Sequence, residues 1–473
     1  MTLKDEVAFW GGPVGFVLAL ALLPGGEVHQ GALAGTAWWM LWWWIGGAVP
    51  LGPTSLLPLA LFPVFGVMDL AATAAPFGSR FIWLFLGGFV LALALERHGL
   101  HRRFALHLLN RLGGGPRRTL FGFMLATALL SMWISNTATT LMMLPMATAV
   151  LGLLEEREGR LSWGPALILG VAYGANTGGM ATLIGTPPNA ALAGVASDQF
   201  GVEIGFVEWM SVGLPTASVV LLLVYGLLVT VHGLPKGRGS EVSLSVVQRE
   251  LRSLPAMGTA EKRVTVLFLG TALLWMFRRP LNAWLGPWDF VLNDTSVAVV
   301  AAIACFALPS GEGKTGRILE ARDLGRLPWE ILLLFGGGLA LAKGFEAAGW
   351  AGLLADGAAS LGWSEGAMLI LVTAIGLFAT ELMSNLALTL LLTPVAGILA
   401  MGMGVHPLYF AAPVALASSG AFMLPMATPP NAIVFSSGRI RMADMARVGV
   451  LLNVVTLVAI LLLWSCLAPA AWR

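Results

Sequence analysis

Charge is what this sequence most lacks. Only 11% of its 473 residues are charged, whereas 57% are hydrophobic. A soluble domain usually carries about 25% charged residues, so the composition argues against a soluble domain and predicts an all-α, polytopic membrane protein. The formal net charge is only +2 and the chain has no basic tail, so nothing in the sequence indicates binding to nucleic acid.

Cysteine and histidine are also scarce, and this argues against two classes of function. The two cysteines, Cys305 and Cys466, lie in separate apolar segments, where a free thiol packs as a small hydrophobic group. The six histidines form no i, i+4 pair and no cluster with cysteine or glutamate. We therefore expect no metal centre of that kind, and the sequence has no nucleophile–base pair that would indicate an enzyme.

Long apolar runs dominate the rest of the sequence. A helix needs about 20 apolar residues to cross the hydrocarbon core, and the runs predict eleven spans. We interpret the first run as a span rather than a leader peptide, because the basic flank before it is weak. The predicted spans are residues 8–24, 33–47, 52–69, 80–97, 164–198, 205–232, 263–279, 290–309, 329–346, 405–436 and 444–469.

Two further apolar segments, 119–151 and 366–400, are too long for one span and have polar centres. The centres read SMWISNTATTLMMLP (Ser131–Pro145) and TELMSNLALTLLLTP (Thr380–Pro394). Each segment forms either two full spans or a re-entrant hairpin that enters and leaves the membrane by the same side.

The positive-inside rule gives the orientation of the chain. If the polar-centred segments are hairpins, four basic segments fall on the cytoplasmic side, with the N-terminus inside and the C-terminus outside. The exception is the pair Arg278-Arg279, which this topology places outside. If each polar-centred segment crossed the membrane twice, the chain would return to the same side. The charge pattern alone therefore does not distinguish hairpins from pairs of full spans. The basic segments are 97–118, 233–263, 310–328 and 437–447.

An internal repeat relates the two halves of the chain. FLGGFVLALALERHG (Phe85–Gly99) resembles FGGGLALAKGFEAAG (Phe335–Gly349) at an offset of 250, and IGTPPNA (Ile184–Ala190) resembles MATPPNA (Met426–Ala432) at an offset of 242. The first copy leads into an arginine-rich segment, whereas the second leads into 347–366, which has no lysine or arginine. The copies are therefore expected to be inverted, and inverted repeats with interrupted helices are typical of secondary transporters.

A Pro-Pro pair interrupts one predicted span in each copy, within residues 185–189 and 427–431. Proline has no N–H donor and clashes with the preceding turn, so each pair is expected to divide its span into two half-helices. Such a break frees carbonyl oxygens, which suit a hard cation such as Na⁺. It also frees N–H groups at a helix N-terminus, which suit an anion.

The polar centres of the hairpins supply neutral oxygen atoms. Ser131 and Ser135 are spaced i, i+4, which predicts that they share a helix face next to Asn136. The second hairpin repeats this pattern with Thr380, Ser384 and Asn385. A single serine or threonine in a membrane helix usually bonds to its own backbone, but this paired pattern indicates a site for sodium and an anion. We interpret Glu381, the only acid in these motifs, as a carboxylate that either supports the site residues from behind or caps a helix, rather than as a proton relay.

The two Ser-Asn-Thr-like motifs, each followed about 45 to 55 residues later by Gly/Ala-Thr-Pro-Pro-Asn, resemble those of the divalent anion/sodium symporter family. This family carries dicarboxylates, citrate and sulfate, and the resemblance covers the chain from about residue 30 to its end. It implies an elevator-type transporter that works as a homodimer, among the lipids of a bacterial cell (inner) membrane. It also implies Na⁺ as the coupling ion and a dicarboxylate or similar small anion as substrate.

The resemblance further implies roles for individual residues. The first sodium site would use Ser131, Ser135, Asn136 and Gly185. The second would use Thr380, Met383, Asn385 and Ala427, with Met383 and Ala427 acting through their carbonyl groups. The substrate would be bound by Asn136, Thr137, Asn385, Thr186 and Thr428, with Pro187 and Pro429 at the two breaks.

One departure from the family pattern is Leu386, which replaces the threonine of the second Ser-Asn-Thr motif. The loss of one neutral hydrogen bond costs about 1 kcal/mol, so the leucine weakens the case for a symmetric dicarboxylate. The leading hypothesis is Na⁺-coupled uptake of a C4-dicarboxylate such as succinate, malate or fumarate. The alternatives are an obligate dicarboxylate exchanger and a Na⁺-coupled carrier of sulfate or another oxyanion. A Na⁺/H⁺ antiporter or arsenite pump is more distant, since only Glu381 could be its buried carboxylate.

The expected fold has about eleven transmembrane helices, two re-entrant hairpins and inverted-topology repeats. We divide the chain into N-terminal scaffold helices, a first repeat, a connector with linking scaffold helices, and a second repeat. These are residues 1–79, 80–232, 233–328 and 329–473. The hairpin and broken helix are 119–151 and 164–198 in the first repeat, and 366–400 and 405–436 in the second.

Overall fold

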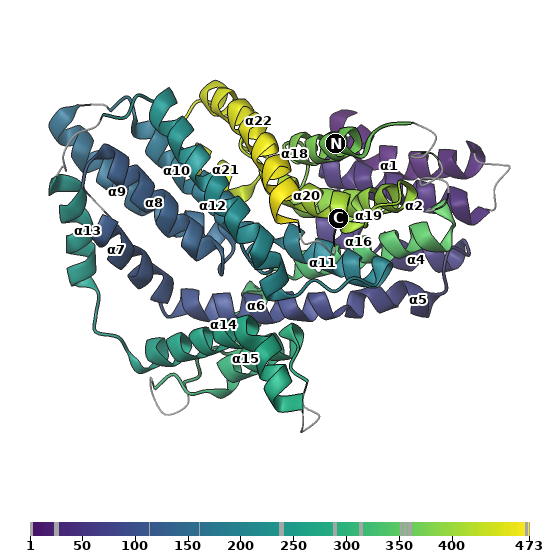
Figure 1. The fold of residues 1–473 in the computed structure, drawn as a ribbon, viewed down its shortest axis with the longest axis horizontal. Coiled ribbons are helices and arrows are strands. Elements are labelled where there is room, and N and C mark those ends of the chain that lie inside the picture. The colour runs from purple at the N-terminus through teal and green to yellow at the C-terminus, as the bar shows by residue number, and fades with distance from the viewer. Residues whose placement is uncertain are drawn as a thin grey trace.

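The computed structural model is helical throughout the residues that it describes (Figure 1), as the composition predicts. Apart from an isolated bridge between Pro309 and Arg317, these residues contain no β-structure. The structure describes residues 3–22, 28–112, 114–159, 161–235, 241–286, 291–311, 316–350, 352, 357, 362–468 and 472. Three basic residues of the predicted basic segments lie outside these ranges: Lys236, Arg238 and Lys314.

Seven helical stretches of the described chain are long and apolar enough to cross a membrane, and four shorter apolar helices accompany them. Two of the seven, Asn136–Glu156 and Asn385–Gly402, belong to the two polar-centred segments, and helix breaks explain why the predicted spans 164–198 and 405–436 are not among them. A broken helix consists of two pieces, and the pieces here have 16 and 14 residues in the first repeat and 11 and 8 in the second.

The chain begins with two long helices, α1 (Leu3–Leu22) and α2 (Val28–Gly46), which pack against each other. Pro13 in α1 has no N–H, so the carbonyl oxygen of Phe9 lacks its usual helical donor. The indole N–H of Trp43 in α2 donates to that oxygen at 2.8 Å. A tryptophan of one helix thus satisfies the backbone group that a proline leaves open in the other.

The prediction of one span over 52–69 is wrong. Pro58 has no N–H to give to the carbonyl of Thr54, four residues earlier, so the helix that contains Thr54 cannot continue. This proline-rich region instead forms short pieces: α3 (Leu51–Thr54), α4 (Leu57–Val64), α5 (Leu70–Ala74) and the 3-10 helix η1 (Ala75–Gly78).

The same order of elements then occurs twice: a long helix, a hairpin, a broken helix and a last long helix. The first copy consists of α6 (Arg80–Arg97), α8 (Pro116–Ser131), α9 (Asn136–Glu158), α10 (Gly164–Gly179), α11 (Pro187–Phe200) and α12 (Phe206–Val231). The second consists of α16 (Trp329–Ala347), α18 (Glu365–Ala379), α19 (Asn385–Gly402), α20 (Leu408–Ser418), α21 (Pro429–Ser436) and α22 (Met442–Leu467). As predicted, the helix is interrupted at each polar centre and before each Pro-Pro pair, and α11 and α21 begin at the first proline of their pair.

Contacts between the two copies are reciprocal. Helix α10 contacts α21 and its counterpart α20 contacts α11, while α12 contacts its own counterpart α22. In the same way, α9 contacts α21 and α19 contacts α11. Reciprocal contacts of this kind are what a two-fold relation produces, and they bring each hairpin against the broken helix of the other copy.

Four further α-helices of the described chain lie outside this repeated order, one between α6 and α8 and the other three between the two copies. They are α7 (Leu100–Leu112), α13 (Glu241–Ser253), α14 (Thr259–Leu285) and α15 (Asp294–Ala307). The amphipathic helices α7 and α13 lie together at one end of the molecule, opposite α1 and α2 (Figure 1). Arg102 of α7 pairs with Glu250 of α13, and Arg103 pairs with Glu261 of α14. Ion pairs therefore connect α7, within the first repeat, to the connector that follows that repeat.

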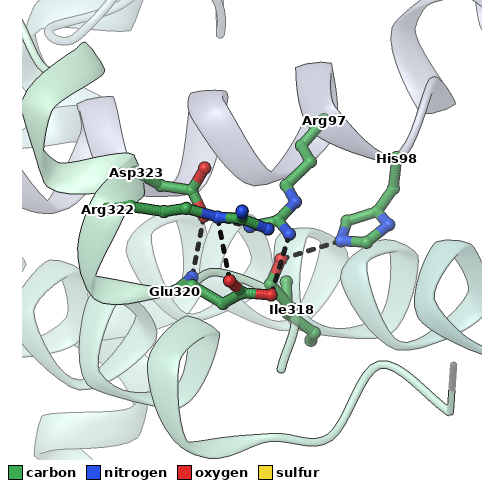
Figure 2. Close-up of polar contacts among 6 residues, drawn as sticks. All are labelled: Arg97, His98, Ile318, Glu320, Arg322 and Asp323. Carbon is green, nitrogen blue, oxygen red and sulfur yellow. Dashed lines mark hydrogen bonds and ion pairs between the residues drawn. The ribbon is translucent and has the colours of Figure 1, made fainter. Parts of the chain in front are cut away.

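Figure 2 shows another group of ion pairs, at the C-terminal end of α6. Arg97 pairs with Asp323 and, at 3.2 Å, with Glu320. Its neighbour His98 contacts the same segment of chain. This segment includes the 3-10 helix η3 (Ala321–Arg326), which directly precedes α16. The first helix of one copy is thus tied to the start of the first helix of the other.

Arg278 and Arg279, which the predicted topology places on the outer side, both have acidic partners. Arg278 Nε lies 3.2 Å from Asp294 Oδ1, and Arg279 pairs with Glu208. Asp294 begins α15 and Glu208 lies in the first turn of α12, so these pairs tie α14 to its two neighbours. Pairing with carboxylates is how charged side chains near membrane-spanning helices are usually accommodated.

Candidate binding site

The first hairpin turns at its Ser-Asn-Thr motif. Ser131 is the last residue of α8 and Ser135 is the N-cap of α9, so the prediction that the two serines share a helix face is wrong. The helix ends between them. Ser135 Oγ accepts a hydrogen bond from the N–H of Ala138 at 3.2 Å, as an N-cap does. Ser131 Oγ instead donates to the side-chain oxygen of Asn136 at 2.6 Å.

The second hairpin repeats this geometry. Thr380 follows the end of α18 and Ser384 is the N-cap of α19, so this pair does not share a helix face either. Thr380 Oγ1 lies 2.7 Å from Asn385 Oδ1 and 2.7 Å from the carbonyl oxygen of Ser418. Each hairpin therefore presents one hydroxyl and one amide oxygen, five residues apart, at the point where it turns.

The first helix break lies directly against the first hairpin. A Cβ atom on Gly179 would lie 2.7 Å from Asn136 Oδ1 and 3.1 Å from the Cβ of Thr186, and one on Gly185 would lie 2.5 Å from the carbonyl oxygen of Gly179. Both positions therefore require glycine for close approach. The structure thus brings together Ser131, Asn136, Gly185 and Thr186, all of which the sequence analysis singled out.

An asparagine holds the backbone of each break. The side-chain amide of Asn189 donates to the carbonyl oxygens of Gly179 at 3.0 Å and Thr182 at 2.7 Å. Asn431, at an offset of 242, donates to the equivalent carbonyls of Ala421 at 3.2 Å and Leu424 at 3.1 Å. Both asparagines are fully buried. They satisfy carbonyl groups that the broken helices leave without partners.

The loop of the second break is also held by Glu381, which is only 2% exposed. Its carboxylate accepts hydrogen bonds from the backbone N–H groups of Phe422, Met423 and Leu424, at 2.8, 2.9 and 3.1 Å. The side-chain amide of Asn453 donates a fourth, at 2.9 Å. These N–H groups belong to the loop between α20 and α21, so Glu381 supports the break itself rather than capping a helix end.

The N-termini of α11 and α21 offer fewer N–H groups than the sequence analysis expected. Thr186 and Thr428 are the N-caps, and two prolines occupy the next two positions of each helix. Proline has no N–H, and the N–H of Asn189 already bonds to the carbonyl of Thr186 at 3.2 Å. An anion at these helix ends must therefore rely on side chains and the helix dipole more than on backbone donors.

The remaining predicted site residues lie close to these elements. Thr137 is in the first turn of α9, Met383 lies between α18 and α19, and both are partly buried. Ala427 is buried next to Thr428. Pro187 is partly buried and Pro429 is exposed, each at the first position of its helix.

A family model described as the sodium:sulfate symporter transmembrane region matches residues 13–469. The chain belongs to the sodium:sulfate symporter family. This confirms the resemblance that the paired motifs indicated. A member of this family is a multi-pass membrane transporter and not an enzyme.

Curated relatives of this symporter family member cover nearly its whole length. The chain is 38% identical over 474 aligned residues, 97% of its length, to the sodium-dependent dicarboxylate transporter SdcS of Staphylococcus saprophyticus, of which it covers 90%. It is also 38% identical to SdcS of Staphylococcus aureus strain USA300, over 91% of this chain and 84% of the relative.

Two solved structures share the fold of this symporter family member. The first is Neisseria gonorrhoeae MtrF, described as one of a class of antimetabolite efflux pumps, with a TM-score of 0.58 and 18% identity over 84% of this chain and 83% of that one. The second is the YdaH transporter of Alcanivorax borkumensis, with a TM-score of 0.53 and 16% identity over 85% of this chain and 87% of that one.

Several buried polar residues of this symporter family member are not among the predicted site residues. Asn189 and Asn431 close the two Thr-Pro-Pro-Asn motifs, so their repetition was a visible signal. Asn176 and Asn453 had no such signal, because each meets its partners only after distant segments have packed together.

Proposed function

We propose that this protein is a secondary active transporter that couples inward Na⁺ movement to the uptake of a C4-dicarboxylate of the succinate, malate or fumarate type. The observation that carries the proposal is the pair of matching hydroxyl–amide clusters, Ser131 with Asn136 and Thr380 with Asn385, each at the turn of a hairpin. Relatives 38% identical over nearly the full length are named sodium-dependent dicarboxylate transporters, which supports the choice of ion and substrate.

Two sodium ions would bind at the turns of the hairpins. Neutral hydroxyl, amide and carbonyl oxygens attract a hard cation, and unwound backbone at matching positions of inverted repeats is where transporters coordinate sodium. Since the sites contain no carboxylate ligand, the ion is held weakly enough to be released, as transport requires. The first site comprises Ser131, Ser135, Asn136 and Gly185, and the second comprises Thr380, Met383, Asn385 and Ala427.

The substrate would lie between the two sodium ions. Its proposed contacts include no arginine or lysine, so the charge of a dianion is offset by the two ions and by the positive ends of the α11 and α21 helix dipoles. Sodium then binds first and organises the hairpins. The proposed contacts are Asn136, Thr137, Asn385, Thr186 and Thr428, with Pro187 and Pro429.

Leu386 favours a second candidate substrate. It occupies the position equivalent to Thr137 and is only 4% exposed, within the apolar core. A second carboxylate at this half of the site meets one hydroxyl fewer, which costs about 1 kcal/mol. The second candidate is therefore Na⁺-coupled transport of sulfate or another compact oxyanion.

Transport would follow an elevator mechanism in a homodimer, in the inner membrane of a bacterial cell. In this proposal residues 1–79 and 233–328 belong to the scaffold, while the hairpins and broken helices of residues 80–232 and 329–473 carry the site. Apolar side chains that are more than half exposed, such as Val266 at 72%, support a surface surrounded by lipid. The bacterial origin of the named relatives supports the membrane assignment.

The test is sodium-driven uptake by the Asn136→Ala variant. This substitution removes one oxygen from the first sodium site and one donor to the substrate, so uptake should be abolished while the protein still elutes as a folded species. Asn110→Ala, on the connecting helix α7, is the matched control and should transport normally. Wild-type uptake by Asn136→Ala would contradict the proposed site.

A further inference from the structure

A buried asparagine of the first repeat contacts the break of the second. Asn176 lies in α10 and is 1% exposed. Its side-chain nitrogen lies 3.0 Å from the carbonyl oxygen of Ala421, 3.2 Å from Thr428 Oγ1 and 3.2 Å from Asn431 Oδ1. Ala421 precedes the Thr-Pro-Pro-Asn motif, whereas Thr428 and Asn431 belong to it. One amide group therefore holds both ends of the second break together.

A second residue of α10 strengthens this contact. Tyr173 lies three residues before Asn176, on the same side of the helix. Its hydroxyl donates to the carbonyl oxygen of Phe422 at 2.8 Å, and the two rings pack edge to face with centroids 5.2 Å apart. One face of α10 is thus built against the second break.

The two-fold relation does not extend to this contact. The position equivalent to Asn176 is Ser418, whose hydroxyl bonds within its own repeat, to Thr389 Oγ1 at 2.6 Å and the carbonyl of Ala415 at 2.9 Å. Asn189 Oδ1, the atom equivalent to the one that Asn176 contacts in Asn431, is buried and has no hydrogen-bond partner among the described residues. The second break therefore receives hydrogen bonds from the first repeat in addition to those from its own, whereas the hydrogen bonds described for the first break come from its own repeat.

The position of Asn176 along α10 gives this asymmetry a consequence. Helix α10 ends at Gly179, one turn later, where the backbone meets Asn136 and Gly185 of the proposed first sodium site. A change in the backbone at that end of α10 therefore occurs only one helical turn from the side chain that contacts the second break. We propose that Asn176 is a positioning residue that couples the two halves of the site, so that sodium bound at the first half organises the second. This inference rests on the proposed function, which assigns the two halves.

The test is the sodium dependence of uptake by Asn176→Ala in proteoliposomes. Coupled sites give a Hill coefficient above 1, up to the number of sites, and coupling energies usually change affinity by about fivefold or more. We expect the Hill coefficient for sodium to fall toward 1, and the sodium concentration for half-maximal uptake to rise about fivefold. Asn176→Ser has a shorter side chain with one hydroxyl hydrogen in place of two amide hydrogens, so it should shift both values in the same direction. It replaces the alanine variant if that variant does not fold.

The control is Thr216→Val, which removes an equally buried polar group that bonds only to its own helix. It should keep the wild-type Hill coefficient. If the Asn176 variants have a lower maximal rate but an unchanged Hill coefficient and sodium affinity, the role of Asn176 is purely structural and the inference is overturned. Absence of sodium dependence in the wild type would overturn the proposed function, and the inference with it.

Discussion

Replacing Glu381 by glutamine perturbs the second helix break at one defined atom. In the wild type, Oε1 accepts hydrogen bonds from the N–H groups of Phe422 and Met423 and from Asn453, while Oε2 accepts one from Leu424. A glutamine side chain has one accepting oxygen and one NH₂ group. Its best orientation keeps the first three bonds and turns the NH₂ group toward the N–H of Leu424, so one bond is lost and two donors face each other.

The expected cost follows from these four bonds. A hydrogen bond to a charged group contributes about 1.5–3 kcal/mol and one to a neutral group about 1 kcal/mol. Losing one charged bond and weakening the other three therefore destabilises the folded state by at least about 3 kcal/mol. Loss of a negative charge next to Thr380 should also weaken sodium binding at the second site, because an opposite charge nearby favours a bound cation.

The assay is thermal unfolding in detergent, followed by tryptophan fluorescence, together with the sodium concentration for half-maximal uptake. Glu381→Gln should unfold at a lower temperature and require more sodium. Glu346→Gln, on an exposed residue of α16, is the matched control and should behave as wild type. Equal melting temperatures for Glu381→Gln and wild type would refute the reasoning, because the carboxylate would then contribute nothing to the loop.

Three further predictions test other parts of the molecule. Leu386→Thr restores a hydroxyl to the second half of the site and should lower the KM for succinate about fivefold, the equivalent of about 1 kcal/mol; an unchanged KM would mean that this position does not face the substrate. Arg97→Ala removes the partner of the nearly buried Asp323 and should reduce stability by about 2 kcal/mol, measured as a lower melting temperature. Burial lowers the pKa of His101, on α7 outside the spans, below its ordinary 6.5. As the pH falls, His101 is protonated in the unfolded chain at a higher pH than in the folded protein, so the free energy of unfolding decreases below pH 6.5. His101→Gln should remove that part of the pH dependence of the melting temperature.

The helix breaks could be predicted from the sequence because their cause is local. A Pro-Pro pair lacks two N–H donors wherever it stands, so the starts of α11 and α21 follow from residues 187–188 and 429–430. The ends of α10 and α20, at Gly179 and Ser418, lie too far before the prolines to follow from them. The repeat was equally visible, because both copies keep the same motifs in the same order. The polar residues at the turns of the hairpins could also be identified, because their neighbours in the sequence are apolar.

Other features could not be predicted because they depend on contacts between distant segments. The length of an apolar run does not show whether its prolines divide it, which is why 52–69 was read as one span. Spacing alone placed Ser131 and Ser135 on one helix face, since it could not show that the helix ends between them. The contact of Asn176 with Ala421 joins residues 245 positions apart, and no local pattern indicates it.

The most direct test of the central claim is uptake of labelled succinate into proteoliposomes with an inward Na⁺ gradient and no internal substrate. The proposed function predicts accumulation that disappears when K⁺ replaces Na⁺. If each transport cycle moves one excess positive charge, a membrane potential of 100 mV contributes about 2.3 kcal/mol to that accumulation. No accumulation under the gradient, with rapid uptake only after the vesicles are preloaded with unlabelled succinate, would contradict sodium coupling and identify an obligate exchanger.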